Sequence, residues 1–261
     1  MTHTARIGVG CLLLLGLGWS VGPAGAVESS YQVGPEIEYF KYKEPGVMDE
    51  SGFMYGLFGA GTFVHEDVWV GRAFMSYVQA DLDYDGALSD GTPLKMSTPN
   101  KVFNLRGTAG YKFPLITYEP MPFVGLGYRY LVDDMPGQGG YKRQQHYFYI
   151  PLGVEGRYEM GNAWVLLPKV EADWLIIGKN NSGGLVFTQK TGFGIRLSVE
   201  AMSPDFFIGS HNFTASVEPF FQYWNVDASD WQDGEISGVQ GTYHEPDNSS
   251  YTAGLRASIV F

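Results

Sequence analysis

Acidic and basic side chains recur at every second position in several segments of this chain, and this spacing could support chemistry. Glu36 is followed two residues later by Glu38, and Glu155 by Arg157. Because successive side chains of a β-strand point to opposite faces, residues two apart share a face. Charges gathered on one face can pair, or they can line a path for protons or a small solute. The inward-facing network predicted in this way is Glu36, Glu38, Arg72, Arg106, Arg129, Glu155, Arg157, Lys169, Glu171, Asp173, Lys190, Arg196, Glu200, Glu218 and Arg256.

A second group of acids has the spacing of the first half of a calcium-binding loop. Asp81, Asp83 and Asp85 alternate ahead of Gly86, and carboxylates in such a pattern can converge on a hard cation. The pattern then departs, because Thr92 stands where a bidentate Glu is expected. The sequence leaves open a solvated acidic strand end or a weak calcium site, the latter formed by Asp81, Asp83, Asp85 and Asp90.

Strand-like segments must position these charges. Alternating apolar and polar residues predict ten strands. Eight strands is the alternative. The ten segments are 31–43, 53–64, 68–83, 101–113, 122–133, 145–159, 163–177, 185–201, 212–226 and 250–261.

The predicted connections alternate between short turns and long loops. Short turns at one end and long loops at the other are typical of barrels that cross an outer membrane. The short turns are expected at 65–67, 114–120, 160–162 and from 203–205 onward. The long loops are expected at 44–51, 84–100, 134–144, 178–184 and 227–249.

The start of the chain predicts a secretory signal peptide. Residues 1–26 combine a short basic region, an apolar stretch around Leu12–Leu15 and the small-residue site Ala24-Gly25-Ala26. Cys11 is the single cysteine and falls within this signal, so the mature chain has no thiol for disulfides or Cys-based metal sites. A net charge of −11 argues against a nucleic-acid partner.

The last predicted strand carries the most specific signal. Tyr251, Leu255 and Ile259 share one apolar face, and the strand ends at Phe261. This pattern resembles the assembly signal of bacterial outer-membrane β-barrels. With two loop stretches, 42–48 ahead of Gly52 and 84–94, the chain resembles small, mostly uncharacterised outer-membrane β-barrel proteins of Gram-negative bacteria.

The resemblance implies an all-β fold, a transmembrane antiparallel up-and-down β-barrel over residues 27–261, in the cell outer membrane. It implies contact with outer-membrane lipid, lipopolysaccharide and the barrel-assembly machinery. No cofactor is predicted, and no extracellular ligand can be named. The narrow interior of such a barrel has room for side chains or one small ligand.

Some outer-membrane barrels are enzymes with characteristic residue patterns. Omptin proteases pair two aspartates on one wall with an Asp-His couple on the other. Asp83 and Asp85 could form the aspartate pair. The sequence contains no Asp-x-His, so His244 and Asp247 would have to serve as the Asp-His couple. For a lipid A deacylase-like triad, His211 and Ser216 have opposite parity, so they cannot share a face.

Three hypotheses follow from the sequence. The first is a non-enzymatic barrel with a salt-bridged, plugged lumen and acidic extracellular loops that serve surface interaction or envelope structure. The second is a narrow or gated channel for small solutes. The third is a barrel hydrolase acting on lipid A, phospholipid or peptide.

Overall fold

The computed structural model describes residues 27–87, 92–113, 119–135, 142–236 and 239–261. The predicted signal peptide, residues 1–26, lies outside them. Ten long antiparallel strands form the barrel. They are β1 (Val27–Glu44), β2 (Met48–His65), β3 (Trp69–Ala87), β4 (Pro93–Tyr111), β5 (Glu119–Asp134), β6 (Lys142–Glu159), β7 (Val165–Ser182), β9 (Gly192–Met202), β11 (His211–Val226) and β14 (Asn248–Val260).

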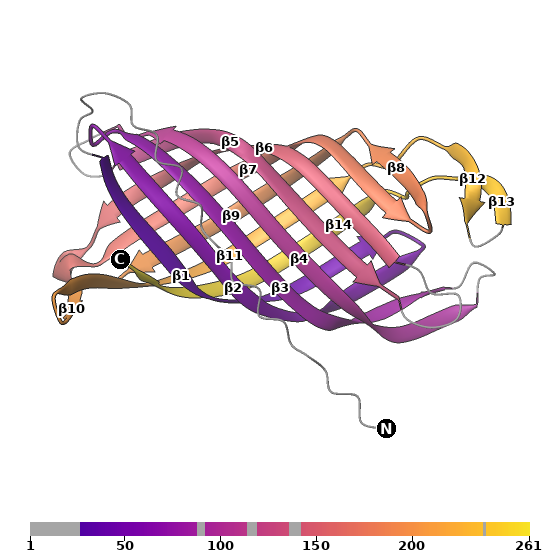
Figure 1. Ribbon diagram of the computed structural model, residues 1–261, viewed down its shortest axis with the longest axis horizontal. Coiled ribbons are helices and arrows are strands. Elements are labelled where there is room, and N and C mark those ends of the chain that lie inside the picture. Colours follow the sequence, from indigo (N-terminus) through magenta and orange to yellow (C-terminus); the bar gives the residue numbers. More distant parts are fainter. Residues whose placement is uncertain (1–26, 88–91, 114–118, 136–141, 237–238) are drawn as a thin grey trace, which may run out of the picture.

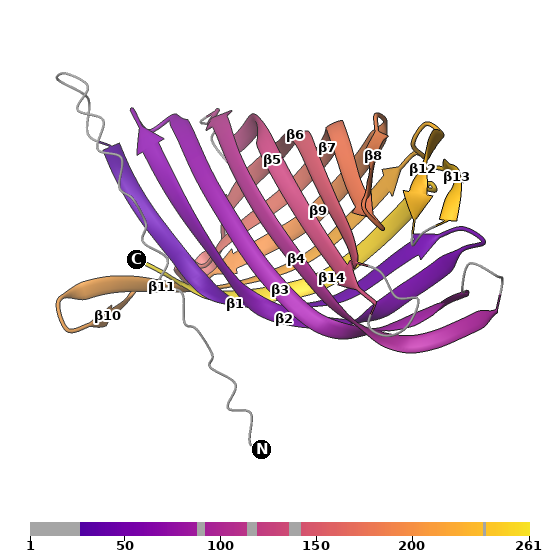
Figure 2. The same cartoon turned by 45° about the vertical axis from the view of Figure 1, so that its right-hand side comes forward.

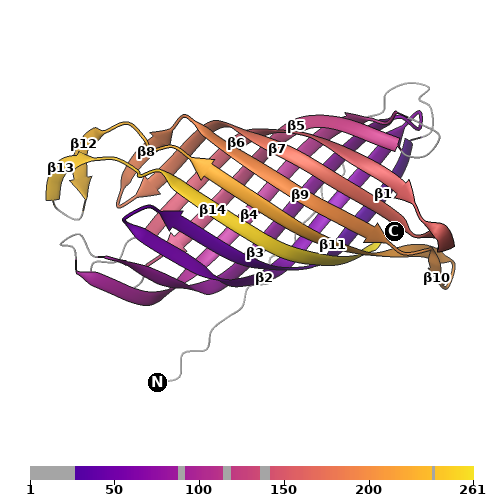
Figure 3. The ribbon, with the colours of Figure 1, turned by 180° about the vertical axis from the view of Figure 1, so that it is seen from behind.

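The ten strands close into one cylinder, which confirms the predicted all-β barrel and excludes the eight-strand alternative (Figure 1). Each strand pairs with its neighbour in the chain, and β14 returns to pair with β1. This β1–β14 ladder, the seam, runs from the Gln32–Val260 pair to the Lys43–Ser249 pair, and Figure 3 shows it from behind. Because every barrel strand has two partners, no edge is left unpaired between them.

Four shorter strands extend the cylinder at its two ends. At the end near the C-terminus, β10 (Phe206–Ile208) folds back on β11 as a hairpin that projects past the barrel (Figure 2). At the other end, β8 (Leu185–Gln189) pairs with β7, and β12 (Gln232–Ile236) pairs with β13 (Val239–Tyr243). A three-residue 3-10 turn, Gly161–Ala163, joins β6 to β7. Within the described residues, no helix is long and apolar enough to cross a membrane.

Most of the connections predicted to be long loops are instead extensions of the strands. The predicted loop at 44–51 is a tight turn, because β2 begins at Met48, and the loop at 178–184 closes on Gly183 and Gly184. Most of the predicted loop at 84–100 belongs to β3 and β4. Beyond the lipid the outer face need not be apolar, so the alternation fades while backbone pairing continues. Of the predicted loop at 134–144, residues 136–141 lie outside the described residues. The predicted loop at 227–249 is long, and it contains the β12–β13 hairpin.

Tight turns close the hairpins with suitable local chemistry. Val47 N donates a 3.0 Å hydrogen bond to Glu44 O, which closes a turn over Pro45 and Gly46. Gly46 has φ of +74°, the conformation that the third position of a type II turn requires. The predicted turn at 65–67 is confirmed, with Glu66 and Asp67 both at positive φ. Of the predicted turn at 114–120, residues 114–118 lie outside the described residues.

The two faces of the wall differ as the alternation predicts. Outward side chains are large and apolar, including Leu57, Leu126, Leu152 and Trp174, all more than 60% exposed. Inward side chains combine charges with aromatic rings, and many are almost fully buried. An apolar outer band around a polar interior is the arrangement that a barrel surrounded by lipid requires.

Candidate functional site in the barrel lumen

The centre of the lumen is crossed by alternating arginine and phenylalanine side chains. The guanidinium of Arg256 lies 4.3 Å from the ring centroid of Phe220 and 4.6 Å from that of Phe74. Arg196 lies 4.7 Å from the Phe220 ring, and Arg106 lies 4.7 Å from the Phe74 ring. We call these five residues the arginine–phenylalanine chain. It runs from β9 to β4, strands on nearly opposite sides of the barrel, so it spans the interior.

Close packing supports this chain of contacts. Phe220 lies over Gly254 of β14, and a Cβ atom at that glycine would come within 2.5 Å of the Phe220 ring. Only glycine leaves room for the ring there. Stacking of a guanidinium on an aromatic face is favourable, and more so when water is excluded, as it is around these buried side chains.

Ion pairs across the lumen neutralise most of the central arginines. Arg256 donates two hydrogen bonds to Glu36, 2.9 and 3.0 Å, and one of 3.1 Å to Glu218. Arg106 of β4 reaches Glu171 of β7 at 2.5 Å. Among the described residues, Nε and one Nη atom of the buried Arg196 lack a hydrogen-bond partner. Arg196 is thus held mainly by its ring contact and by the surrounding charges.

A second polar cluster fills the lumen toward the β12–β13 end. Arg143 bonds the carboxylate of Glu44, lies 3.2 Å from Asp133 and 3.9 Å from Glu50. These side chains are nearly inaccessible to solvent. The sequence pattern does not predict this cluster, because Glu44, Glu50 and Arg143 fall in predicted loops and Asp133 is not among the predicted network residues. The signal was present, since Glu44 continues the inward parity of Glu36 and Glu38.

Glu245 of the long loop is buried near this cluster, where the charges of Glu44 and Arg143 act on it. It lies between β13 and β14, accepts a hydrogen bond from Asn180, and exchanges backbone and side-chain bonds of 2.9 Å with Ser229. Burial, and secondarily the carboxylate of Glu44, raises the pKa of Glu245 to about 8. The loop is therefore bonded to β7 through a carboxyl group that favours its neutral form.

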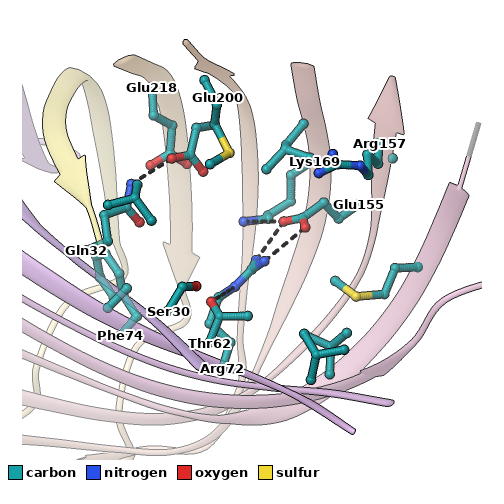
Figure 4. A pocket seen from close by; sticks show the side chains of 18 of the residues that line it. Ser30, Gln32, Thr62, Arg72, Phe74, Glu155, Arg157, Lys169, Glu200 and Glu218 are labelled. Carbon is teal, nitrogen blue, oxygen red and sulfur yellow. Dashed lines mark hydrogen bonds and ion pairs between the residues drawn. The ribbon is translucent and has the colours of Figure 1, made fainter. Parts of the chain in front are cut away.

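A cavity of about 210 Å³ lies at the opposite end of the lumen, next to the C-terminus (Figure 4). Arg72 binds Glu155 through two hydrogen bonds of 2.6 and 3.0 Å, and Lys169 reaches the same carboxylate at 2.8 Å. On the far side, Gln32 donates a 2.6 Å hydrogen bond to Glu200. The arginine–phenylalanine chain contributes Phe74, Arg106 and Arg256 to the walls, so it bounds the cavity on the inner side.

Fourteen of the fifteen predicted network residues line the interior or its rim. Eight are buried, five are half-buried, and Arg157 lies at the rim with its side chain 39% exposed. Lys190 requires a correction. It lies in a break between β8 and β9, is exposed, and pairs with Asp230. The break changes which positions face the lumen: the odd-numbered Gln189 faces inward before the break, and the even-numbered Gly194 faces inward after it.

The acids considered for calcium binding do not form a loop. Asp81, Asp83 and Asp85 lie on β3 with their side chains on its exposed face, and Asp85 pairs with Lys95 at 2.7 Å. Residues two apart on a strand are about 6.8 Å apart, too far to converge on one ion. Asp90 lies outside the described residues. Among the described residues, no group of three or more acids, histidines or cysteines could hold a metal.

The histidines do not assemble with acids into a catalytic arrangement in the described part of the chain. His244 packs against Trp231, with ring centroids 3.8 Å apart, whereas Asp83 and Asp85 lie on the outer face of β3. Asp247 is exposed in the same loop. His211 is exposed at the start of β11, whereas Ser216 is buried in the lumen.

The terminal strand lies where the sequence pattern places it. Tyr251, Leu255 and Ile259 point outward from β14, each about 40% exposed. Phe261 and Tyr31 exchange two backbone hydrogen bonds, 2.8 and 2.9 Å, and their rings lie 6.1 Å apart. The chain therefore ends on the seam, beside the first strand.

Comparisons with known proteins place this fold. No protein-family model matches the sequence, and no curated protein matches it. The outer membrane protease OmpT from Escherichia coli superimposes with a TM-score of 0.55 at 10% identity, covering 90% of this chain and 96% of that one. The beta domain of the Bordetella autotransporter BrkA gives a TM-score of 0.38 at 11% identity, covering 86% of this chain and 98% of that one. OprG from Pseudomonas aeruginosa gives a TM-score of 0.37 at 9% identity, covering 91% of this chain and 95% of that one.

At such low identity, the likeness to OmpT is evidence for the fold alone. Together with the closed strand order and the apolar outer band, it confirms the predicted class of protein and its location. The chain has the fold of the Gram-negative outer-membrane β-barrels and belongs in the cell outer membrane.

Proposed function

We propose that this protein is a non-enzymatic outer-membrane barrel whose lumen is plugged and whose loop-bearing end, with the β12–β13 hairpin, makes surface contacts or supports the envelope. The observation that carries the proposal is the arginine–phenylalanine chain, which spans the lumen from wall to wall. Its buried charges are paired across the barrel, as with Arg256 and Glu36, so a passing solute would have to break these pairs. Breaking a buried ion pair costs about 3–5 kcal/mol.

A hydrolase is the less favoured alternative, despite the likeness of fold to a protease. The acids offered for such a role, Asp83 and Asp85, face outward, and His244 contacts Trp231 rather than an acid pair. The carboxylates clustered around Arg143, such as Glu50 and Asp133, are almost inaccessible to a substrate. A hydrolytic site needs a base and a nucleophile that a substrate can reach.

The test is single-channel current through the refolded protein in a planar bilayer, with folding checked by heat-modifiable gel migration. We expect no discrete openings for the wild type or for the exposed-cation control Lys190→Ala. A Phe220→Ala/Arg196→Ala variant should produce openings, because it removes one end of the arginine–phenylalanine chain. Openings of the wild type that change in size or ion selectivity in Arg196→Ala would instead make the protein a gated channel.

The surface role is tested separately. Deleting the β12–β13 hairpin should leave heat-modifiable migration unchanged, since these strands pair only with each other. Loss of adhesion or of envelope integrity in cells carrying this folded variant would support a role for the loop. Unchanged cells would direct the search to the remaining hairpin tips.

A further inference from the structure

The cavity at the C-terminal end of the barrel has walls of opposite charge. Going round the barrel, the arc from β3 to β7 contributes five basic side chains and two acidic ones. They are Arg72, Arg106, Lys112, Arg157, Lys169, Glu119 and Glu155. The arc from β9 to β14 contributes Glu200, Glu218 and Arg256, and Arg256 is already engaged with Glu36. Figure 4 shows Glu200 and Glu218 on one side and Arg72, Lys169 and Arg157 on the other.

The pairing on the basic wall leaves positive charge in excess. Arg72 and Lys169 share the single carboxylate of Glu155. Arg106 pairs with Glu171, and Arg157 pairs with Glu159 at the rim. Lys112 has no ion pair within the described residues, so the excess rests on Arg72, Lys169 and Lys112. An anionic group entering the cavity would therefore meet several donors that are not fully neutralised.

The acidic wall has the opposite excess. Glu200 faces the cavity and accepts a hydrogen bond from the amide of Gln32, but among the described residues it forms no ion pair, and Arg72 acts on it only across the cavity. Glu218 shares Arg256 with Glu36, and the charges of Arg196 and Lys169 also act on it, so the unpaired negative charge of this wall rests mainly on Glu200. A simple anion would leave Glu200 without a cation.

We propose that the cavity binds a small zwitterion of the amino-acid class. Its carboxylate would face Arg72, Lys112 and Lys169, and its ammonium would face Glu200 and Glu218. About 210 Å³ equals the liquid volume of about seven waters, which suits one amino acid. Apolar lining from Met121, Leu167 and Met202 favours an apolar side chain. The proposal concerns the cavity alone and holds whether or not the lumen is plugged.

The probe is L-leucine, titrated by calorimetry into the refolded barrel in detergent. Two matched controls each lack one charge: 4-methylpentanoate has no ammonium, and 3-methylbutylamine has no carboxylate. We expect leucine to bind about tenfold or more tightly than either, since a hydrogen bond to a charged group contributes about 1.5–3 kcal/mol.

Variants assign the two walls. Glu200→Gln should weaken leucine binding about tenfold and leave the binding of 4-methylpentanoate unaffected. Lys112→Gln should weaken the binding of both leucine and 4-methylpentanoate, because each carries a carboxylate. Lys190→Gln, at the far end of the barrel, should change nothing. Equal binding of leucine and 4-methylpentanoate would overturn the zwitterion assignment in favour of an anion site. No heat of binding for leucine at millimolar concentration, with a folded barrel, would overturn the proposal. Bilayer conductance reports on the plug separately.

Discussion

Arg256 of the last strand donates two hydrogen bonds, 2.9 and 3.0 Å, to the carboxylate of Glu36 in the first strand. The two residues stand opposite each other in the β1–β14 pairing, 220 positions apart in the chain. Both side chains are about 2% exposed. One buried pair thus joins the seam of the barrel to the arginine–phenylalanine chain that crosses it.

This relationship predicts a large and asymmetric effect on stability. Arg256→Met should lower the free energy of unfolding by about 3–5 kcal/mol, because it leaves the Glu36 carboxylate buried without its partner. The double variant Glu36→Leu/Arg256→Met should recover part of that loss, because no lone charge remains. Urea unfolding of the refolded barrel measures both. Arg157→Met, at the exposed rim, is the control and should cost less than about 1 kcal/mol. Equal effects at the rim and the seam would contradict the prediction.

The apolar outer band predicts that a charged substitution destabilises the barrel more the deeper it lies in the lipid. Leu152 lies midway along β6 and is 61% exposed. Leu152→Arg should destabilise the barrel in phospholipid vesicles by about 2–4 kcal/mol, because the charge would enter hydrocarbon. Ser97→Arg, on the outer face of the projecting part of β4, should cost less than about 1 kcal/mol. If the two substitutions were equally tolerated, the lipid would not lie where we place it.

The geometry of β3 predicts that calcium is not needed by the acids on that strand. Because Asp81, Asp83 and Asp85 are spread along an extended strand, they cannot supply ligands at 2.3–2.6 Å to one ion. The melting temperature should therefore be the same in calcium and in EDTA, and Asp83→Asn should leave it unchanged. Stabilisation by calcium that Asp83→Asn removes would show that these carboxylates converge after all.

The raised pKa of Glu245 predicts a stability that falls with rising pH. The carboxyl titrates near its ordinary 4.5 when exposed and at about 8 when buried. The folded state therefore binds more protons over this range, and stability declines as pH rises, until the loss is complete above about 8. Glu245→Gln cannot ionise, so its stability relative to the wild type should increase between about pH 5 and about pH 9. Urea unfolding at the two pH values measures this, and a constant difference would refute it.

Sequence reasoning located the strands because lipid imposes period-two alternation on the outer face. It placed Glu155, Glu171 and Arg256 inside for the same reason. It failed where that constraint ends. Past the lipid, Glu44 and Glu50 were read as loop residues, although backbone pairing continues through them. The alternation of inward and outward side chains is also interrupted at the break between β8 and β9, so Lys190 lies at the surface rather than in the lumen.

Sequence could not predict which charges meet. Arg72 and Glu155 are 83 positions apart, and Arg106 and Glu171 are 65 apart. Such contacts depend on the tilt and stagger of the strands, which alternation does not encode. The arginine–phenylalanine chain is of the same kind, because its five members come from five different strands.

The seam also has a consequence for the time course of folding. Its contacts join residues near 32 to residues near 260, so they close the largest loop in the chain. Contacts this distant in sequence are entropically slow to form. The other strand pairs are between neighbours in the chain and can form earlier, whereas the cylinder stays open until β14 is present. We therefore expect closure at the seam to be the last and rate-limiting event, with an open, curved sheet as the species that precedes it.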